Sequence, residues 1–588
     1  MKRTKIVCTI GPSVNSLEMV LALIKAGMDV ARLNFSHGEQ SKHLETLNML
    51  KEARKISSRP LAILLDTKGP EVRVGELQSG ILELRKGQRY WLVSEDQADG
   101  PDKIPVKPGS VLKNMEEGMD VLFNDGYISS KVLQSSEQGV LVEINNYGEL
   151  KSSKSVNVPN ARLDLPAMTK QDISDIEFAC EQDLDIIAAS FIRSAHHLME
   201  IRKLLKSCGK PEIKILAKIE NAEGVQNFDS ILRVSDGIMV ARGDMGVELP
   251  LSEVPRLQKM MIRKTYLSGK ISVTATQMLE SMIHCPRPTR AEVSDVANAI
   301  YDSSCAVMLS GETAIGKYPI ETVEMMNQII QQSEKHFDFI EFFNRYLEQT
   351  YKHVPFSVTL ATVKTAYSAS ATAIFALTSS GATAQLLARL RPKMPIIAFT
   401  PNAKSFHQMA LNWGVQPVLD TQNCTSIGQA FEVSSQAALK ENYVQYGDLV
   451  VLTAGRPFGV VGTTNTMIVE NIGQVLLRGH AGKGKRIQGK VCLLLSPEGT
   501  DYQKAKDKIL VIPKCNYMYL PFFMGALGVI LENHIEDDES EQHVLKCAEE
   551  LNIPVLVRAD GAFSALSDDL EITLDPEHKL VFQGSINE

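Results

Sequence analysis

The sequence has no run of about 18 uninterrupted apolar residues, so it predicts no membrane-spanning helix. Its first positions, Met1-Lys2-Arg3-Thr4-Lys5, are polar and charged, and no signal peptide is expected there. None of its nine cysteines belongs to a CxxC pair. Most of them lie in apolar runs, as Cys8, Cys305 and Cys492 do, so we expect reduced thiols in a cytoplasmic protein.

The chain also lacks an excess of positive charge. Its 62 Lys and Arg residues stand against 70 Asp and Glu residues, which gives a net charge of −8. Nucleic-acid binders usually carry a basic excess, so no nucleic-acid partner is expected, although a local positive pocket for phosphates is compatible with this balance. The chain of 588 residues is too long for one compact core, and several domains are predicted.

Eight short β-rich runs alternate with amphipathic helical segments in the first part of the chain, a pattern typical of βα units. The runs are 5–11, 29–36, 61–67, 185–191, 213–221, 237–244, 271–278 and 306–313. Ser16 and Gly27 are predicted to cap the first helix. This alternation predicts a (β/α)8 barrel, whose active site is expected at the carboxyl ends of the strands. Polar residues follow nearly every run.

The remaining regions differ in pattern. Residues 1–69 and 167–345 are assigned to the barrel, and 70–166, with short strands and turn signals, to an inserted all-β lid domain with a β-barrel fold. Residues 346–475 predict an α/β domain with a regulatory role. The glycine-rich segment 479–485 is interpreted as a linker, and 486–588 predict a small α/β domain.

Five motifs occur in a fixed order along the chain. They are 215–225, 32–38, 65–73, 239–248 with 274–282, and 286–299 with 308–314. In these motifs the sequence resembles the pyruvate kinase family over about residues 1–475. The resemblance implies transfer of the phosphoryl group of phosphoenolpyruvate to ADP in glycolysis, with Mg²⁺ or Mn²⁺ and K⁺ as cofactors. It also implies allosteric control by a phosphorylated effector and a homotetramer.

Lys218, Glu220 and Asp244 are the central candidates. Lys218 precedes Glu220 by two positions, so strand alternation directs both side chains to one face. Glu220 and Asp244 follow neighbouring strands and suit two oxygen ligands of Mg²⁺ or Mn²⁺. Solvated rim carboxylates and a lysine paired for structure alone are the alternatives. The resemblance implies that the acids hold the metal and that Lys218 is catalytic.

Several basic residues are candidates for binding phosphate groups. A guanidinium at Arg32 offers a planar grip on a phosphate, and the resemblance implies that it contacts the transferred phosphoryl group. The resemblance also implies a nucleotide site made of Arg73, His37, Lys154, Asn34 and Asp125. For His37 and Asp125 the alternative is a surface charge or a turn residue.

Oxygen-bearing side chains follow the second and third strands, at Asn34, Ser36, Asp66 and Thr67. Such a set of low charge suits K⁺, and the resemblance implies a K⁺ site there. Glu71 agrees, because the resemblance associates a glutamate at this position with K⁺ dependence.

Thr276, after the seventh run, is a candidate for relaying the proton that the enolate needs. Thr276 itself, a chain of waters and another group all remain open as the acid. Gly243 and Asp244 are expected to present backbone N–H groups to the substrate carboxylate. The resemblance places 286–299 beside a subunit contact.

Two further features lie beyond the barrel. A nest of N–H groups and hydroxyls is predicted where a strand meets a helix, and it resembles an effector phosphate loop made of Thr378, Ser379, Ser380, Gly381 and Thr383, assisted by Arg456. Simple helix capping is the alternative. The tail resembles a phosphohistidine swivel domain, in which His543 aligns with the phosphorylated histidine. Glu541-Gln542 replaces the usual Thr-Ser, so a structural role is favoured.

Two other readings compete with this one. Barrel lyases and aldolases also bind pyruvate-type substrates through Mg²⁺, but they lack the pairing of Arg32 with Arg73 and the lid with Lys154. A metabolite sensor without catalytic activity would be expected to have lost one of four residues, and all four are present: Lys218, Glu220, Asp244 and Thr276.

Overall fold

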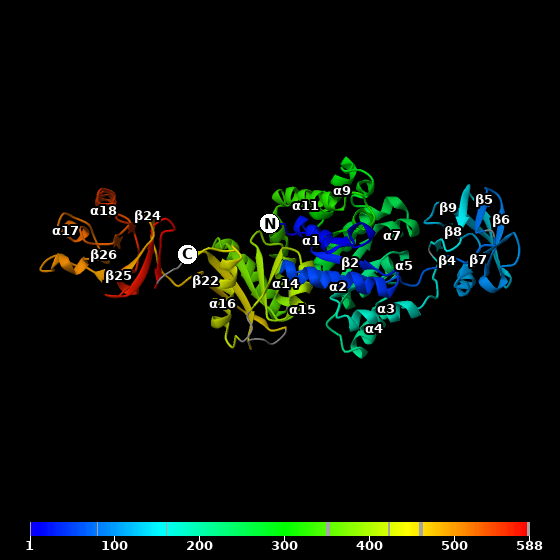
Figure 1. Ribbon diagram of the computed structural model, residues 1–588, viewed down its shortest axis with the longest axis horizontal. Helices are drawn as coiled ribbons and strands as arrows, with labels where there is room; N and C mark the ends of the chain where they lie inside the picture. Colours follow the sequence, from blue (N-terminus) through cyan, green and yellow to red (C-terminus); the bar gives the residue numbers. More distant parts are fainter. Residues whose placement is uncertain are drawn as a thin grey trace. The chain divides into compact units, whose positions relative to one another are not determined.

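The computed structural model describes residues 2–78, 80–159, 161–347, 353–420, 424–457 and 462–584. These residues form two compact units. Figure 1 shows the helices and strands, coloured from blue to red along the sequence. The first comprises 1–360, 376–422 and 455–465, and the second 361–375, 423–454 and 466–588. The predicted domain start at 346 falls next to residues 348–352, and the predicted domain end falls at 588; residues 348–352 and 588 are outside the described ranges.

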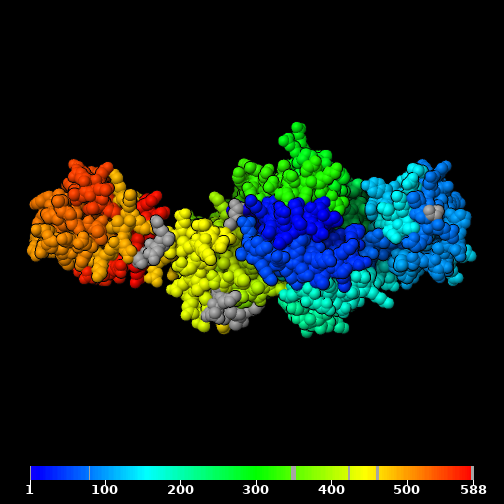
Figure 2. All heavy atoms as spheres, in the orientation of Figure 1, coloured from blue at the N-terminus to red at the C-terminus, as the bar shows by residue number. Residues whose placement is uncertain are grey.

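Eight parallel strands of the first unit close into a barrel, as predicted, in the order β1-β17-β16-β15-β14-β13-β3-β2. The strands are β1 (Lys5–Thr9), β2 (Val30–Asn34), β3 (Ala62–Asp66), β13 (Ile186–Ala189), β14 (Lys214–Ile219), β15 (Gly237–Ala241), β16 (Ile271–Ala275) and β17 (Ala306–Leu309). The first and last strands pair in parallel, so early and late segments of the barrel lie side by side (Figures 1 and 2).

Helices alternate with these strands. They are α1 (Leu17–Ala26), α2 (Gln40–Ser57), α3 (Lys170–Glu181), α4 (Ala195–Ser207), α5 (Ala222–Gln226), α6 (Phe228–Val234), α7 (Arg242–Glu248), α8 (Val254–Leu267), α9 (Arg290–Tyr301), α10 (Gly311–Ala314) and α11 (Pro319–Lys335). The predicted caps of α1 are confirmed, because Ser16 accepts a hydrogen bond from the Met19 N–H and Gly27 ends the helix at φ 130°.

The barrel has two apolar layers. Val30, Leu64, Leu216 and Met239 are fully buried in one cluster, while alternate strand residues such as Ile63 pack with the surrounding helices in another. Strand alternation produces this division, because neighbouring residues of a strand face opposite sides. Both layers exclude water, and the few polar residues within the strands, such as Ser272 and Thr274 of β16, are buried.

The strands end earlier than predicted. The run 237–244 is a strand only to Ala241, and α7 begins at Arg242, which places Asp244 in the first turn of a helix. The run 271–278 ends as β16 at Ala275, and the next residue, Thr276, has φ 66°. The polar residues that lengthened the predicted runs therefore belong to turns and helix starts.

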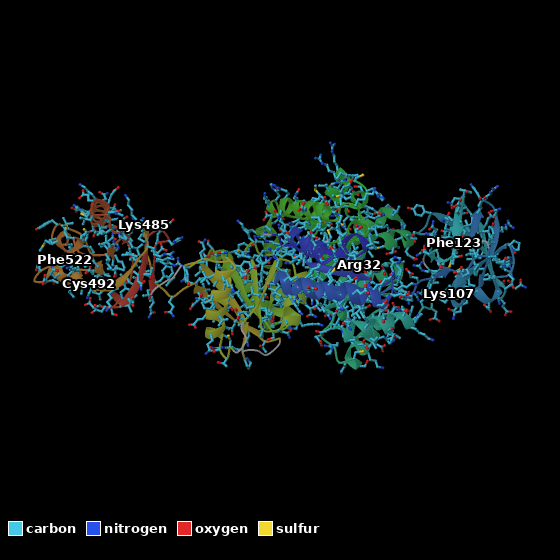
Figure 3. The ribbon with its side chains drawn as sticks, viewed as in Figure 1. Arg32, Lys107, Phe123, Lys485, Cys492 and Phe522 are labelled. Carbon is cyan, nitrogen blue, oxygen red and sulfur yellow. The ribbon has the colours of Figure 1, made fainter. Side chains whose placement is uncertain are left out.

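The inserted region is all-β, as predicted. Its strands are β4 (Arg73–Val74), β5 (Ile81–Leu84), β6 (Arg89–Ser94), β7 (Lys103–Lys107), β8 (Asp120–Phe123), β9 (Ile128–Ser136), β10 (Gly139–Ile144), β11 (Gly148–Lys151) and β12 (Val156–Asn157). Seven of them form one sheet, and β5 pairs with β11. Hydrogen bonds from Val74 N to the Lys154 carbonyl and from Val156 N to the Val72 carbonyl bring the edges of the large sheet together. Phe123 is fully buried inside (Figure 3).

A five-stranded sheet follows, in the order β20-β19-β18-β21-β22. The elements of this α/β region are α12 (Phe339–Leu347), α13 (Val354–Ser368), β18 (Ala373–Leu377), α14 (Ala382–Arg389), β19 (Ile396–Thr400), α15 (Ala403–Gln408), β20 (Val415–Leu419), α16 (Ile427–Lys440), β21 (Leu449–Gly455) and β22 (Thr464–Asn471).

The tail forms an eight-stranded sheet. Its elements are β23 (Val475–Arg478), β24 (Ala481–Lys483), β25 (Ile487–Leu493), β26 (Lys508–Ile512), α17 (Leu520–Phe523), β27 (Gly528–Leu531), α18 (Asp538–Leu551), β28 (Val555–Val557), α19 (Ala562–Ala565), β29 (Glu571–Asp575) and β30 (Leu580–Gln583). Phe522 and Cys492, marked in Figure 3, are buried in its core.

The linker prediction for 479–485 was wrong. Within this segment β24 pairs with β28. The glycines serve close packing, because a Cβ at Gly482 would come within 2.4 Å of the Pro576 carbonyl oxygen and one at Gly484 within 2.6 Å of the Pro554 Cα. The glycines of this segment suggested a flexible linker. In the fold they are needed because no larger residue fits at these positions.

Among the described residues, no helix combines the length and apolar character that crossing a membrane requires. The cytoplasmic location stays a prediction.

Candidate active site

Four charged side chains meet at the carboxyl end of the barrel. Arg32 Nε donates to Asp66 Oδ2 over 2.7 Å, and Lys218 Nζ lies 3.0 Å from Asp66 Oδ1 and 2.9 Å from Glu220 Oε1. β2, β3 and β14 contribute Arg32, Asp66 and Lys218, and Glu220 follows β14. The predicted convergence of the lysine, the first acid and the arginine is therefore confirmed, and Asp66 joins the two basic groups.

Asp66 is fully buried, which by itself favours a neutral carboxyl group. The positive charges of Lys218 and Arg32 outweigh this effect and hold the pKa of Asp66 below its usual range. Burial lowers the pKa of Lys218, but the negative charges of Asp66 and Glu220 raise it by more than burial lowers it. The net shift of the Lys218 pKa is therefore upward. Lys218 is therefore a permanent ammonium group, the state that stabilises developing negative charge.

Glu220 and Asp244 are electrostatically coupled. Burial is the main cause that raises the pKa of Glu220 to about 7, and Asp244 raises it further against the opposing effect of Lys218. Asp244 is open to the cavity at this end of the barrel, yet the surrounding protein desolvates it enough to raise its pKa, and Glu71 contributes in the same direction. Two neighbouring carboxylates disfavour each other's charge until a cation joins them.

Arg32 is held from a second side. Its Nη1 donates to Thr9 Oγ1 over 2.8 Å, and the Thr9 carbonyl accepts a hydrogen bond from the Thr313 hydroxyl. Thr313 lies in α10, directly after the last barrel strand. The planar guanidinium is therefore fixed in direction by Asp66 and Thr9.

Thr276 lies beside the start of α7. Its Oγ1 accepts a hydrogen bond from Gly243 N at 2.9 Å and donates to the Ala275 carbonyl at 2.6 Å. The Gly243 N–H, which we expected to face the substrate carboxylate, is thus occupied by Thr276. Arg242 pairs with Asp295 over 2.6 Å and donates a hydrogen bond to the Thr276 carbonyl. Asp295 therefore helps to hold Arg242 against the turn that contains Thr276.

Three of the four side chains predicted to bind K⁺ accept hydrogen bonds or ion pairs from the protein. Asn34 Oδ1 accepts from Ser36 N, and Thr67 Oγ1 accepts from Ser190 N at 3.1 Å. The two carboxylate oxygens of Asp66 form ion pairs with Arg32 and Lys218. These oxygens lie at the ends of the adjacent strands β2 and β3.

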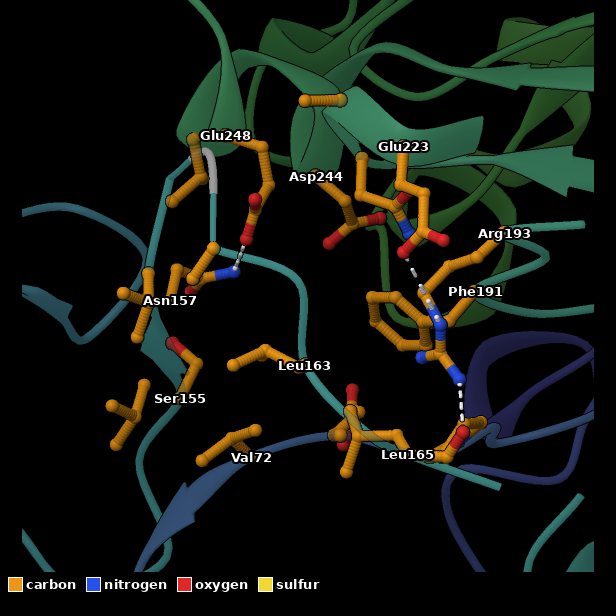
Figure 4. A pocket seen from close by; sticks show the side chains of 18 of the residues that line it. Val72, Ser155, Asn157, Leu163, Leu165, Phe191, Arg193, Glu223, Asp244 and Glu248 are labelled. Carbon is orange, nitrogen blue, oxygen red and sulfur yellow. Dashed lines mark hydrogen bonds and ion pairs between the residues drawn. The ribbon is translucent and has the colours of Figure 1, made fainter. Parts of the chain in front are cut away.

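Some of the predicted nucleotide ligands line a cavity of about 350 Å³ between the lid and the barrel (Figure 4). They are Arg73, Lys154 and Asp125, and Asp244 lines the same cavity. Arg73 pairs with Glu71 over 2.6 Å. Asp125 accepts a hydrogen bond from Ser155 in the turn between β8 and β9. Asn34 and His37 are not among the lining residues, and the His37 side chain is exposed.

Two hydrogen-bonded contacts connect the lid with the barrel at this cavity. Asn157 Nδ2 of the lid donates to Glu248 Oε1 of α7 over 2.8 Å, and Arg193 Nη2 donates to the Leu165 carbonyl over 2.7 Å (Figure 4). Sequence analysis missed Asn157, Arg193 and Glu248. No local pattern marks them, because each gains its partner from a distant part of the chain.

Thr9 and Ser190 were missed as well. Ser190 directly follows β13, and its hydroxyl accepts a hydrogen bond from Lys218 over 2.7 Å. A polar residue at the carboxyl end of a barrel strand was a usable signal for both residues.

The predicted effector loop joins β18 to α14. Gly381 has φ 81° and its N–H donates to Thr378 Oγ1. Thr383 Oγ1 lies 2.7 Å from Thr464 Oγ1, and the Arg456 N–H donates to Asn465 in the same segment. The Thr378 hydroxyl group is thus engaged within the loop, and the Thr383 hydroxyl group with a residue 81 positions away, whereas α14 has no side-chain cap hydrogen bond. Arg456 is exposed and belongs to the same unit.

Fold and site together define a (β/α)8-barrel enzyme for a phosphorylated, anionic substrate. A fixed lysine and arginine supply the positive charge, and Glu220 and Asp244 supply carboxylate oxygens of the kind that divalent cations bind. No group of three or more His, Cys, Asp or Glu side chains within the described ranges is arranged to hold a metal ion.

Comparison with known proteins shows which family of barrel enzymes the chain resembles. The family model described as pyruvate kinase, barrel domain, matches residues 1–323, and that described as pyruvate kinase, alpha/beta domain, matches 357–470. The pyruvate kinases of Geobacillus stearothermophilus and Staphylococcus saprophyticus are each 40% identical, over 99% and 100% of both chains respectively. That of Staphylococcus aureus strain MRSA252 is 39% identical over 100% of both chains.

The chain belongs to the pyruvate kinase family. It is accordingly a phosphotransferase of glycolysis, and the family's reaction transfers the phosphoryl group of phosphoenolpyruvate to ADP. The family generally depends on Mg²⁺ and K⁺. The alignment with the relatives extends over the tail.

Proposed function

We propose that phosphoenolpyruvate binds between Lys218, Arg32 and Asp244. Arg32 grips the transferred phosphoryl group, and the Lys218 ammonium stabilises the negative charge that develops on the enolate oxygen. Thr276 faces the carbon that receives the proton. The observation that carries this assignment is the position of Lys218, whose ammonium lies within 3.0 Å of both Asp66 and Glu220 and is thus held at the carboxyl end of the barrel.

Glu220 and Asp244 suit a divalent cation. Burial is the main cause of their raised pKa values, and nearby carboxylates add to it: Asp244 for Glu220, and Glu71 for Asp244. A bound Mg²⁺ or Mn²⁺ would favour the charged form of both acids. When bound, such a cation polarises the phosphoryl and carboxylate oxygens of the substrate. Asp244 is open to the cavity, so substrate oxygens have access to this position.

ADP is proposed to enter from the cavity beneath the lid. Arg73 and Lys154 line this cavity and supply positive charge for its phosphates. Asn34, His37 and Asp125 are proposed to complete the nucleotide site. The Asn157–Glu248 contact provides a place where the lid rests on the barrel.

A coupled assay tests the proposed function directly. Pyruvate formed from phosphoenolpyruvate is followed with ADP, Mg²⁺ and K⁺ present, and omission of ADP serves as the control. Formation of pyruvate that depends on ADP is expected. Equal pyruvate release without ADP would show a phosphatase or lyase instead.

A K⁺ requirement is the first prediction. Asn34, Ser36, Asp66 and Thr67 offer oxygen ligands of low total charge, and Glu71 adds a carboxylate nearby. In Na⁺-free and K⁺-free buffer balanced with tetramethylammonium, we expect kcat to fall by at least about tenfold and to recover when K⁺ is added. Glu71→Lys should restore activity without K⁺, because an ammonium group replaces the cation's charge. Full wild-type activity without K⁺ would contradict the proposal.

We propose that a sugar phosphate or a nucleoside monophosphate binds at the loop of Thr378, Ser379, Ser380, Gly381 and Thr383, near Arg456. Backbone N–H groups at the start of α14 favour an anion there. Ser380→Glu should abolish the activation or inhibition by such an effector, since it adds negative charge, whereas Ser207→Glu, at the exposed end of α4, should leave the response intact. A panel of phosphorylated metabolites, assayed at subsaturating phosphoenolpyruvate, measures this response.

A homotetramer is proposed as the assembly. Leu251 is 76% exposed and Ile315 64% exposed in the first unit, which leaves apolar side chains for a subunit contact. For the tail we propose a structural role. His543 is exposed, and Glu541, two residues earlier, pairs with Arg558 and adds negative charge where a phosphate would stand.

A further inference from the structure

The hydroxyl group of Ser190 sits between the catalytic lysine and the residues that follow β3. Ser190 is 3% exposed. Its Oγ lies 2.7 Å from Lys218 Nζ, 2.6 Å from the Thr67 carbonyl oxygen and 3.2 Å from Asp66 Oδ1. Its backbone N–H donates to Thr67 Oγ1. Both ends of the residue are therefore tied to the 66–67 segment.

The geometry determines that the Ser190 hydroxyl group accepts a hydrogen bond from Lys218. A serine hydroxyl has a single proton to donate, and the shorter of its two acceptor contacts is the Thr67 carbonyl. An ammonium group donates only, so Ser190 must accept from Lys218. The lone pair of Ser190 thus faces Lys218, whichever acceptor takes the proton.

Lys218 has three N–H donors, and three oxygens lie within 3.0 Å of Nζ. Two belong to the carboxylates of Asp66 and Glu220 and the third to Ser190. A lysine side chain has several rotatable bonds, and carboxylates on two sides do not fix its third direction. The third bond supplies that direction without adding another negative charge.

We propose that Ser190 is a positioning residue for the phosphoryl transfer proposed above: its hydroxyl group holds the Lys218 ammonium in one position, from which its positive charge acts on the substrate. Ser190 acts through Lys218 and does not itself touch the reacting atoms. The surrounding packing keeps the residue in place, because a Cβ built on Gly69 would approach Ser190 Cβ to 2.8 Å. Small displacements of a reactive group reduce rates strongly. We therefore expect that loss of the Ser190 hydroxyl group lowers kcat.

Ser190→Ala in the full chain tests this inference. A hydrogen bond to a charged group is lost, and we expect kcat to fall by about 10- to 100-fold with KM for phosphoenolpyruvate changed by less than about threefold. Ser272→Ala is the matched control. Ser272 is also a fully buried serine of the barrel, and its hydroxyl group accepts from the Cys305 N–H. This control should keep kcat within about twofold.

A double variant separates positioning from a general loss of structure. If Ser190 acts through Lys218, Ser190→Ala should not lower the residual rate of Lys218→Met any further. An additional tenfold loss in the double variant would overturn the inference. Ser190→Thr keeps the hydroxyl group and should retain kcat within about threefold of wild type. A kcat as low as that of Ser190→Ala would also overturn it.

The outcomes distinguish this inference from the proposed function. An active Lys218→Met variant would remove the proposed role of Lys218, and this inference with it, while the ADP-dependent reaction would stand. An inactive Lys218→Met with an unimpaired Ser190→Ala would leave the function standing and remove the role of Ser190. Thermal unfolding of every variant shows whether each rate belongs to a folded barrel.

Discussion

Lys218→Met is expected to lower kcat by about 10²- to 10⁴-fold while the protein remains folded. Methionine has a similar length but no charge, so the stabilisation of the developing enolate is lost. Binding of phosphoenolpyruvate should persist, since Arg32 and the acid pair remain. The coupled assay measures the rate, and calorimetric titration measures substrate binding.

The folded state should tolerate this change. Asp66 keeps its 2.7 Å hydrogen bond with Arg32, and Glu220, whose pKa is already raised to about 7, can take up a proton in place of its lysine partner. Lys206→Met, at the exposed end of α4, is the matched control and should have wild-type activity. Turnover of Lys218→Met near the wild-type value would refute the assignment of Lys218.

Removing one acid of the proposed metal pair is expected to have an effect of similar size. Glu220→Gln and Asp244→Asn each remove a negative charge and an oxygen ligand, so binding of Mn²⁺ should weaken by at least about tenfold and kcat should fall by 10²-fold or more. Electron paramagnetic resonance of free Mn²⁺ measures binding to the protein without substrate. This measurement does not depend on activity.

Glu223→Gln provides the control for the acid pair. Glu223 lines the same cavity but lies beside Arg193, at 4.0 Å. Its replacement should leave Mn²⁺ binding within about twofold of wild type. If Glu223→Gln weakened Mn²⁺ binding as strongly as Asp244→Asn does, the cation would be attracted by the general negative charge of the cavity, and the proposed ligand pair would be wrong.

Local patterns were sufficient for much of the barrel. The alternation of apolar runs with amphipathic helices predicted eight parallel strands, and the caps Ser16 and Gly27 were placed correctly. The two-residue spacing of Lys218 and Glu220 predicted that both side chains share a face, and their 2.9 Å contact confirms it. These features depend on neighbours in the chain, which is why a sequence displays them.

Other features depend on distant partners, and sequence reasoning failed there. The glycines of 479–485 looked like a linker, because the close approach of Pro576 and Pro554 is set by the folded sheet. The Gly243 N–H was expected to be available to substrate, but the turn after β16 brings Thr276 to it. Asn157 meets Glu248 across 91 positions of the sequence.

The order of residues was enough to predict the succession of barrel units, the all-β insertion, the family and the charged residues that the chemistry requires. It did not show how those charges are joined in the fold: Asp66 between Arg32 and Lys218, Ser190 bonded to the lysine, and Asp244 at the start of a helix. The reason is physical. Periodicity and capping are set by adjacent residues, whereas ion pairs and their pKa values depend on which strands the closed barrel brings together.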